Sequence, residues 1–466
     1  MPAQVTVRMY DQQNLGDCFL LEFKDQGKLS YILIDFGSYE TGNQERELEM
    51  ANSIKSIVQD EPIIIVLTHQ HKDHLSGFIT AKEAIDTLNV ADVWFSYLDD
   101  PKSKEGKAMR EAMKKLLKTN DKIKEKTRVK FGEVESVKKM LKAKDAIDLF
   151  AEDQTGGQAY TNLIGLCKKT PQFLLPGQSF DLPRLPKNSV RVYVMGPPTD
   201  EKLLRKMNPS GDEAVHSLNA VSGMMNLETS SSLMLNALNA ISPGEDSYET
   251  ANFPFNKTFS FPLNDATKKL PVRDSYSAET WRRIDHEWLS EMGRMSLHLG
   301  NLTNNSSLVL AFELVEQEKV LLFVADAQIG NWKSWLDLSF NGSSVDAKDL
   351  LTRTVFYKAG HHSSHNATLA EGLDLMNEKE LVIMIPINEE VSTKMNFAML
   401  QQGMLKGYNR KSEGRVLRAD TIFHKPKSAS AFKFPFASSE KDFSPKVKIV
   451  KDKSKESHLY IEYVVK

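Results

Sequence analysis

The sequence has few features of a secreted or membrane-bound protein. Only two cysteines, Cys18 and Cys167, occur among its 466 residues, and they form no CxxC pair. This scarcity argues against a disulfide framework and fits a reducing compartment. No apolar run approaches the roughly 18–20 residues that a membrane-spanning helix requires, and the opening residues lack the basic start and apolar core of a signal peptide. We therefore expect a soluble, cytoplasmic protein with no membrane association.

An excess of charge of one sign is also missing. The chain has 60 Lys and Arg against 62 Asp and Glu, a formal net charge of −2. Binding to nucleic acid would therefore have to rest on a local patch. One candidate is the segment 102–130, which carries 12 Lys and Arg against 4 Asp and Glu with apolar residues at helical spacing. It is either a solvated helix face or a basic rim that attracts a polyanionic substrate.

Strand-like segments alternate with helical ones along much of the chain. The runs VTVRM, CFLLEF and LSYILIDFG are rich in β-branched and aromatic residues and are bounded by polar turns. A helical stretch then precedes two further strand-like runs, an order that predicts an α/β fold with a layered core. We predict a helix over 45–57 and strands over 5–9, 18–23, 29–37, 63–67, 90–97, 189–198, 306–315, 319–327, 354–360 and 381–387.

The chain is long for one domain, since domains usually run to roughly 100–200 residues. We expect one domain over residues 1–425 that contains two large inserted segments, at about 98–188 and 199–300. The second segment is rich in Ser, Asn and Met, and its apolar residues have mixed spacing, so it could cover a site as a cap. We expect residues 426–466 to form a C-terminal extension in which KVKIV and LYIEYVV pair as a β-hairpin.

Histidine is scarce, yet three of the 11 histidines fall within six positions of the stretch IIIVLTHQHKDHLSG, residues 63–77. His69 and His71 lie two apart, so in an extended loop their side chains point the same way. Asp73 and His74 follow and could serve a second centre. Imidazole and carboxylate groups of this kind suit zinc, manganese or iron. A histidine-rich surface loop is the alternative, but the buried-looking strand directly before the motif favours a metal site.

Two further pieces of sequence supply the same chemistry. A second cluster, YKAGHHSSHNAT, holds His361, His362 and His365 directly after a predicted strand. Asp326 ends the apolar run LLFVADA, where a carboxylate is costly to bury unless it is paired or binds a metal. A surface histidine pair and a turn aspartate are the alternatives. A carboxylate at Asp326 could bridge two cations, and two cations with such a bridge form a hydrolytic site.

Together these motifs resemble the metallo-β-lactamase superfamily. The closer resemblance is to the metallohydrolase domain of the competence protein ComEC and its soluble relatives. The stretches that carry it, besides the HxHxDH motif, are MYDQQNLGDCFLLEF…YILIDFG (9–37), NNSSLVLAFEL…VLLFVADA (304–327), KAGHHSS (358–364) and GRVLRAD (414–420). The two inserted segments match no part of this family.

The resemblance implies a four-layer αββα sandwich with two metal ions, Zn²⁺ or Mn²⁺, at one edge of its sheets. It implies that His69 and His71 hold the first metal, and that Asp326 bridges both. The second metal would be held by Asp73 and His74 with either His361 or His362, a choice that the sequence leaves open. Asp73 would also orient the attacking hydroxide, so that Asp73 and Asp326 are the expected catalytic residues.

The sequence departs from this pattern at two places. Most members of the superfamily supply a further histidine to the first metal, but the matching position here reads Gly196-Pro197-Pro198. Ser363 replaces the glycine that usually follows the second histidine of the later motif. Substitute ligands could come from His216, His286, His298, Asn304 or Asn305, of which His298 and Asn304 are the two that we favour, since both lie close to Asp326 in sequence.

Three polar residues beside the expected metals are candidates for contacting a substrate oxyanion, namely Lys358, Ser363 and Ser364. Pairing of Lys358 with a surface carboxylate is an equally plain interpretation of that residue.

We therefore expect a metal-dependent hydrolase that cleaves phosphodiesters through a metal-activated hydroxide. The resemblance indicates DNA as the substrate, and a free-standing cytoplasmic nuclease is the form that we favour. Such a nuclease could be one component of a multi-gene stress or antiviral defence system. One alternative is a hydrolase of small esters, lactams or lactones, because this fold supports many chemistries. The other is a scaffold protein with a degenerate metal site, a hypothesis that the missing histidine motivates. Its insertions would then be surfaces for protein partners.

Overall fold

The computed structural model describes residues 2–39, 43–108, 153–206, 303–395, 399–420 and 446–466, except 455 and 456, with isolated positions between 110 and 128 and between 208 and 213. The chain divides into two compact units, of which the first comprises Met1–Met109, Glu152–Ser222 and Asn301–Lys466. The second comprises Arg110–Ala151 and Gly223–Gly300. The expected cap at 199–300 and the basic segment at 102–130 lie largely outside the described residues.

Strands of the first sheet come mainly from the N-terminal part of the chain. Within the described residues this sheet has eight strands in the order β14-β15-β1-β2-β3-β4-β5-β6. Pairing is antiparallel from β14 to β3 and parallel from β3 to β6. The strands are β1 (Gln4–Tyr10), β2 (Cys18–Asp25), β3 (Lys28–Phe36), β4 (Ile63–Val66), β5 (Val90–Ser96), β6 (Gln172–Leu174), β14 (Val447–Lys451) and β15 (His458–Val465).

The second sheet has the same division into an antiparallel and a parallel half. Its seven strands in the described residues run β13-β12-β11-β10-β9-β8-β7. Pairing is antiparallel from β7 to β10 and parallel from β10 to β13. The strands are β7 (Ser179–Asp181), β8 (Val190–Gly196), β9 (Val309–Leu314), β10 (Lys319–Phe323), β11 (Thr354–Lys358), β12 (Val382–Ile385) and β13 (Val416–Arg418).

A large apolar core joins the two sheets. Alternate residues of each strand face it, such as Val5, Val7 and Met9 of β1 and Leu310 and Phe312 of β9. Strand β4 is buried along its whole length, as expected for a parallel strand that is covered on both faces. The burial of these side chains drives the two sheets together, because apolar area removed from water stabilises the fold by roughly 25 cal/mol per Å².

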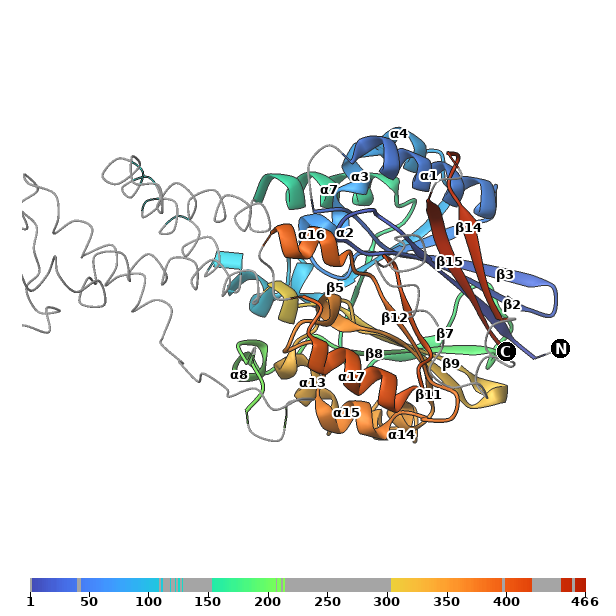
Figure 1. Ribbon diagram of the computed structural model, residues 1–466, viewed down its shortest axis with the longest axis vertical. Coiled ribbons are helices and arrows are strands. Elements are labelled where there is room, and N and C mark those ends of the chain that lie inside the picture. Colours follow the sequence, from blue (N-terminus) through green and yellow to red (C-terminus); the bar gives the residue numbers. More distant parts are fainter. Residues whose placement is uncertain are drawn as a thin grey trace, which may run out of the picture. The chain divides into compact units, whose positions relative to one another are not determined.

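Helices cover the outer face of each sheet (Figure 1). A second apolar cluster packs the first sheet against α1 (Gln44–Val58), α3 (Gly77–Thr80), α4 (Lys82–Ile85) and α7 (Asp153–Leu166). On the other side, Tyr357 of β11 contacts Trp332 and Tyr408. The helices of that side are α13 (Ile329–Trp335), α14 (Ala347–Thr352), α15 (Ala370–Leu375) and α17 (Gln402–Lys411).

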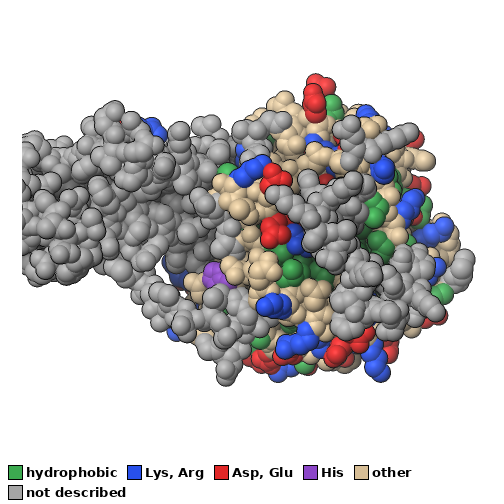
Figure 2. Space-filling view, viewed as in Figure 1, with side chains coloured by type: hydrophobic (Ala, Val, Ile, Leu, Met, Phe, Trp, Pro, Cys, Tyr) green, Lys and Arg blue, Asp and Glu red, His purple; other side chains and the backbone are tan. Residues whose placement is uncertain are grey.

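Three short helices complete the described elements that matter for the site, α2 (Lys72–Leu75), α8 (Glu201–Leu204) and α16 (Glu389–Lys394). In the described part of the chain, no helix has the length and apolar character needed to cross a membrane. On the face shown in Figure 2, acidic and basic side chains are interspersed over the described surface, in keeping with the small net charge of the chain.

The expectation of an α/β fold is confirmed, with two mixed sheets that pack on each other. The expected boundaries of the insertions and the extension need correction. Residues 153–188, which the sequence analysis grouped with the first insertion, supply α7 and the edge strands β6 and β7. The C-terminal hairpin pairs with β1 as part of the first sheet, because β15 is as apolar as a core strand.

Candidate metal centre

The topology brings five loop segments to one end of the two sheets. Loops that follow the parallel strands β4, β10 and β11 leave at the carboxyl ends of those strands. Because β2 runs antiparallel to β3 and β9 runs antiparallel to β10, the loops that enter β2 and β9 lie at this same end. Backbone hydrogen bonds join the segments, from Leu308 to Thr68 at 2.9 Å and from Asp17 to Asp73 at 2.9 Å.

The first sheet contributes the histidine-rich loop. His69, His71, Asp73 and His74 follow β4 on a short loop and helix α2, and each is at most 4% exposed. Close backbone packing holds this loop down. A Cβ atom at Gly37 would lie 2.4 Å from the Leu75 nitrogen, so only glycine allows the chain to approach here.

The second sheet contributes Asp326 after β10 and the two adjacent histidines after β11. The backbone of these turns is unusual, because His361, His362 and Ser363 have φ angles of +39°, +46° and +64°. Ala325, directly before Asp326, also has a left-handed φ of +48°. Non-glycine residues held in this region carry strain of order 1–3 kcal/mol each and concentrate at functional sites.

The cluster divides into two groups that share Asp326. In the first group, His69 Nε2 lies 3.0 Å from His71 Nδ1, and one oxygen of Asp326 lies within 4.8 Å of one ring nitrogen of each. This is the group that the sequence analysis expected for the first metal.

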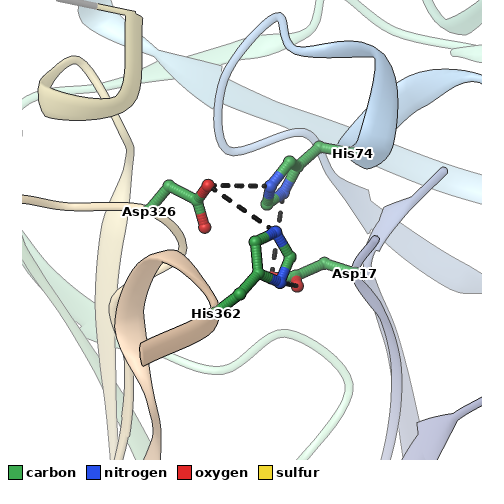
Figure 3. Close-up of side chains that lie close together, drawn as sticks. All are labelled: Asp17, His74, Asp326 and His362. Atoms are coloured by element: carbon green, nitrogen blue, oxygen red, sulfur yellow. Dashed lines mark ion pairs between the residues drawn. The ribbon is translucent and has the colours of Figure 1, made fainter. Parts of the chain in front are cut away.

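In the second group, His362 Nε2 lies 3.0 Å from Asp73 Oδ2, and His74 Nε2 lies 3.4 Å from Asp326 Oδ2. Figure 3 shows His74, His362 and Asp326 converging, with Asp17 behind the two rings. The geometry therefore places His362, of the two adjacent histidines, beside Asp73 and His74. His361 Nε2 instead accepts a hydrogen bond from Asn304 Nδ2 at 3.0 Å.

Hydrogen bonds on the far side of three rings set their tautomers. His74 Nδ1 donates to Asp35 Oδ2 at 2.7 Å, and His362 Nδ1 donates to the Pro386 carbonyl at 2.6 Å. The Thr68 hydroxyl donates to Asp35 at 2.7 Å and can accept from His69 Nδ1 at 3.1 Å. A neutral ring that donates through Nδ1 carries a lone pair on Nε2, so each of the three rings, once it has lost its second proton, presents a ligand atom to the centre.

Charge at the centre is unbalanced. Asp17, Asp35, Asp73 and Asp326 are all at most 4% exposed, and the buried ammonium of Lys358 contacts Asp17. Burial acts to raise the pKa of Asp326, but His74, His362 and Lys358 outweigh it and hold this pKa well below its ordinary value. Buried negative charge is costly unless cations compensate for it.

The donor set therefore fits divalent cations. Imidazole and carboxylate groups in this number are ligands for zinc or manganese, and the outer hydrogen bonds orient them as in protein metal sites. Asp73 Oδ1 and Asn304 Oδ1 are buried and accept no hydrogen bond from the described part of the chain. The residues positioned to hold cations are His69 and His71 in the first group, His74 and His362 with Asp17 or Asp73 in the second, and Asp326 in both.

Other residues named from the sequence lie differently. The Lys358 ammonium is buried against Asp17 and the Ala325 carbonyl, so it is not an exposed group for a substrate and does not pair with a surface carboxylate. The Ser364 hydroxyl lies 2.7 Å from His361 Nδ1, and Ser363 is fully buried. His365 contacts Asn208. His216, His286 and His298 lie outside the described residues.

Of the two asparagines, only Asn304 contacts the histidines described above. Asn305 Nδ2 donates to the carbonyls of Leu203, Leu204 and Lys206, and its Oδ1 accepts from the Gln328 and Asn331 amides. Asn305 therefore anchors α8 against α13 and is occupied by backbone groups. Asn304 stays the candidate for an additional ligand.

Four residues that shape the centre were not singled out from the sequence: Asp17, Asp35, Thr68 and Ser307. Asp35 ends the apolar run YILIDF, which is the same signal that pointed to Asp326. The Ser307 hydroxyl lies 3.3 Å from His69 Nδ1 and accepts from the Asp326 amide at 3.2 Å. The roles of Asp17 and Ser307 follow from sheet order, which spacing along the chain does not reveal.

Comparison with known proteins adds no family to this geometry. No model of a known protein family matches the chain, and no similar sequence was found among curated proteins.

Proposed function

We propose that this protein is a metal-dependent hydrolase with the metallo-β-lactamase fold, and that it cleaves phosphodiester bonds in nucleic acid. The observation that carries the proposal is the buried cluster of histidines and aspartates at the shared end of the two sheets. Its two groups meet at one carboxylate, Asp326, which is the arrangement that a bridged pair of cations requires. The resemblance of the motifs to the ComEC-type metallohydrolases supports the choice of nucleic acid.

Bound Zn²⁺ or Mn²⁺ would lower the pKa of a water molecule and stabilise negative charge on the attacked phosphate. The residues of the chain would supply position and proton handling. Asp73 is ionised at neutral pH, since burial raises its pKa but His74 and His362 outweigh burial and lower it. Its Oδ2 faces His362 Nε2 at 3.0 Å, where the two could share a cation, and its Oδ1 would orient a water molecule and accept its proton.

Burial of the ligands favours one order of events at this site. Four buried carboxylates outnumber the positive charges of Lys358, His74 and His362, so the centre without cations has no surplus positive charge to attract a phosphodiester anion. Cations must therefore be present before the substrate approaches, and cleavage is expected to require them. The basic segment at 102–130, most of which lies outside the described residues, would attract the phosphate backbone of a nucleic acid independently of its sequence.

The test is cleavage of labelled single-stranded and double-stranded DNA with Mn²⁺, Zn²⁺ or EDTA. Wild-type protein would be compared with Asp73→Asn and with Asp60→Asn, a control whose carboxylate is fully exposed. We expect metal-dependent cleavage that Asp73→Asn abolishes and Asp60→Asn retains. No cleavage of either DNA by protein shown to carry metal would overturn the DNA nuclease, and the same metals would then be tested with RNA, small esters and lactones.

A further inference from the structure

A buried ion pair spans the two sheets directly behind the candidate ligands. Asp17 lies at the entry to β2 in the first sheet, and Lys358 ends β11 in the second. The Lys358 ammonium contacts an Asp17 carboxylate oxygen, and the two side chains are 2% and 1% exposed. The ammonium also donates to the Ala325 carbonyl at 2.8 Å. Neither residue is positioned as a surface group.

The pair reaches the ligands from behind. Lys358 Nζ lies 3.6 Å from Asp326 Oδ1, whereas the other oxygen, Oδ2, faces His74 Nε2 at 3.4 Å and His362 Nε2 at 4.0 Å. The Asp17 carboxylate lies 3.8 Å from the Nδ1 atoms of both histidines. The two oxygens of Asp326 thus have different neighbours, an ammonium on one side and imidazoles on the other.

Stability alone does not account for this pair. Replacement of a buried ion pair by apolar residues is often neutral or stabilising, because both charges must leave water. A lone ammonium at this position would also compete with cations for Asp326. The adjacent Asp17 carboxylate removes that difficulty, since the pair carries no net charge while its ammonium still lies 3.6 Å from one oxygen of Asp326.

We propose that the Asp17–Lys358 pair is a positioning device for Asp326, an inference that rests on the proposed metal centre. Lys358 attracts Oδ1 across 3.6 Å, which favours the rotamer of Asp326 in which Oδ2 faces the site between the two groups. Asp17 holds the ammonium in place and balances its charge, which leaves Asp326 available to cations. Asp17 lies close enough to His74, His362 and Asp326 to share a cation with them, but its contact with Lys358 assigns it to the positioning role, in which both residues act through Asp326.

The test compares cobalt binding by the wild type and by the double variant Asp17→Asn with Lys358→Met, which buries no unpaired charge. Co²⁺ titration would follow affinity and the visible absorption spectrum, and thermal unfolding would report the fold. Loss of partners that orient a metal ligand typically lowers metal affinity about 10- to 100-fold. We expect a loss of this size and a changed spectrum in the folded double variant. The control is Arg8→Met with Glu22→Gln, which breaks an ion pair between β1 and β2.

Wild-type affinity and spectrum in the double variant would overturn the proposal. If that variant does not fold, cobalt titration of the single variant Asp17→Asn tests the proposal instead. Lys358 then has Asp326 as its nearest described carboxylate, so we expect cobalt affinity to fall at least tenfold, and unchanged affinity would overturn the proposal. Because cobalt binding is measured without substrate, tight binding by a wild type that cleaves no DNA leaves the positioning role standing and removes the nuclease. A wild type that binds no cobalt overturns both.

Discussion

The two histidine groups of the centre contain similar ligands but differ in the balance between burial and nearby charge. Burial lowers the pKa values of His69 and His71, to about 4 for His71, and outweighs Asp326, which acts to raise both, and Asp73, which acts to raise that of His71. Burial also acts to lower the pKa of His74, but Asp326, Asp17, Asp73 and Asp35 outweigh it and raise this pKa well above its ordinary value.

This difference indicates that the two cation positions have unequal affinities. The carboxylates of the second group attract a cation more strongly than the neutral rings of the first group do. The first group also lacks the further histidine expected where the chain reads Gly196-Pro197-Pro198, and the candidate substitute Asn304 contacts His361. We therefore expect one tight and one weaker cation position, with Asp326 belonging to both.

The largest effect is expected from the residue that the groups share. Asp326→Asn keeps the size of the side chain but removes the charge that both positions use, and we expect tight binding of Zn²⁺ and Mn²⁺ to disappear. Isothermal titration of the variant would measure this loss. Asp337→Asn, which changes an exposed aspartate after α13, should bind as the wild type does. Retention of wild-type affinity by Asp326→Asn would contradict a shared carboxylate.

A paired comparison measures the inequality directly. His74→Gln removes a ring from the carboxylate-rich group, and His71→Gln removes one from the other group. We expect His74→Gln to abolish the tight binding phase, while His71→Gln keeps it and loses the weaker one. Metal per chain, measured at low and high free Zn²⁺, separates the two results. Equal losses in both variants would show that the groups are equivalent.

Bound cations should also stabilise the fold, because ligands that bind only the native state shift the unfolding equilibrium. A cation at 100 times its dissociation constant contributes about 2.7 kcal/mol. Addition of Zn²⁺ should raise the midpoint of thermal unfolding of the wild type, and EDTA should reverse the rise. His71→Gln should keep most of the shift and His74→Gln little of it. A shift of the same size in Asp326→Asn would assign the stabilisation to another site.

The smallest effect is expected on stability, from the backbone conformation of the loops, which also differs between the two groups. The second group is reached through the left-handed residues His361, His362 and Ser363, whereas the described loop around His69 and His71 has no positive φ angle at a non-glycine residue. Ser363→Gly should stabilise the protein by about 1 kcal/mol, because glycine adopts this conformation without strain. Ser363→Ala keeps the Cβ atom and is the matched control. Urea denaturation would compare them, and equal stabilities would show that the turn is unstrained.

The first group was predictable from sequence because its ligands follow one apolar strand at close spacing. Asp326 and the paired histidines were predictable for the same reason. The choice of His362 beside Asp73 was not, since it depends on two left-handed residues in succession. Asp17 was also missed, because its place at the centre follows from β2 running antiparallel to its neighbour.

The fold shows the same division. The long apolar runs gave strands such as β3 and β9 close to their observed bounds. Strands β6 and β7 are only three residues long, too short for an alternating pattern to be recognised, and they were therefore placed in an insertion. Helices α13 and α17 carry their buried aromatic residues among polar ones, and their packing on the second sheet depends on contacts with Tyr357 that only the folded chain supplies.

The central claim is that this cluster holds catalytic cations, and the most direct measurement is metal content beside activity. Purified wild-type protein and Asp326→Asn would be loaded with Zn²⁺ or Mn²⁺, dialysed, analysed for metal per chain and then tested on DNA. We predict at least one retained metal ion in the wild type, none in the variant, and cleavage only by the wild type. A wild type that retains no metal, or a variant that retains as much, would contradict the account.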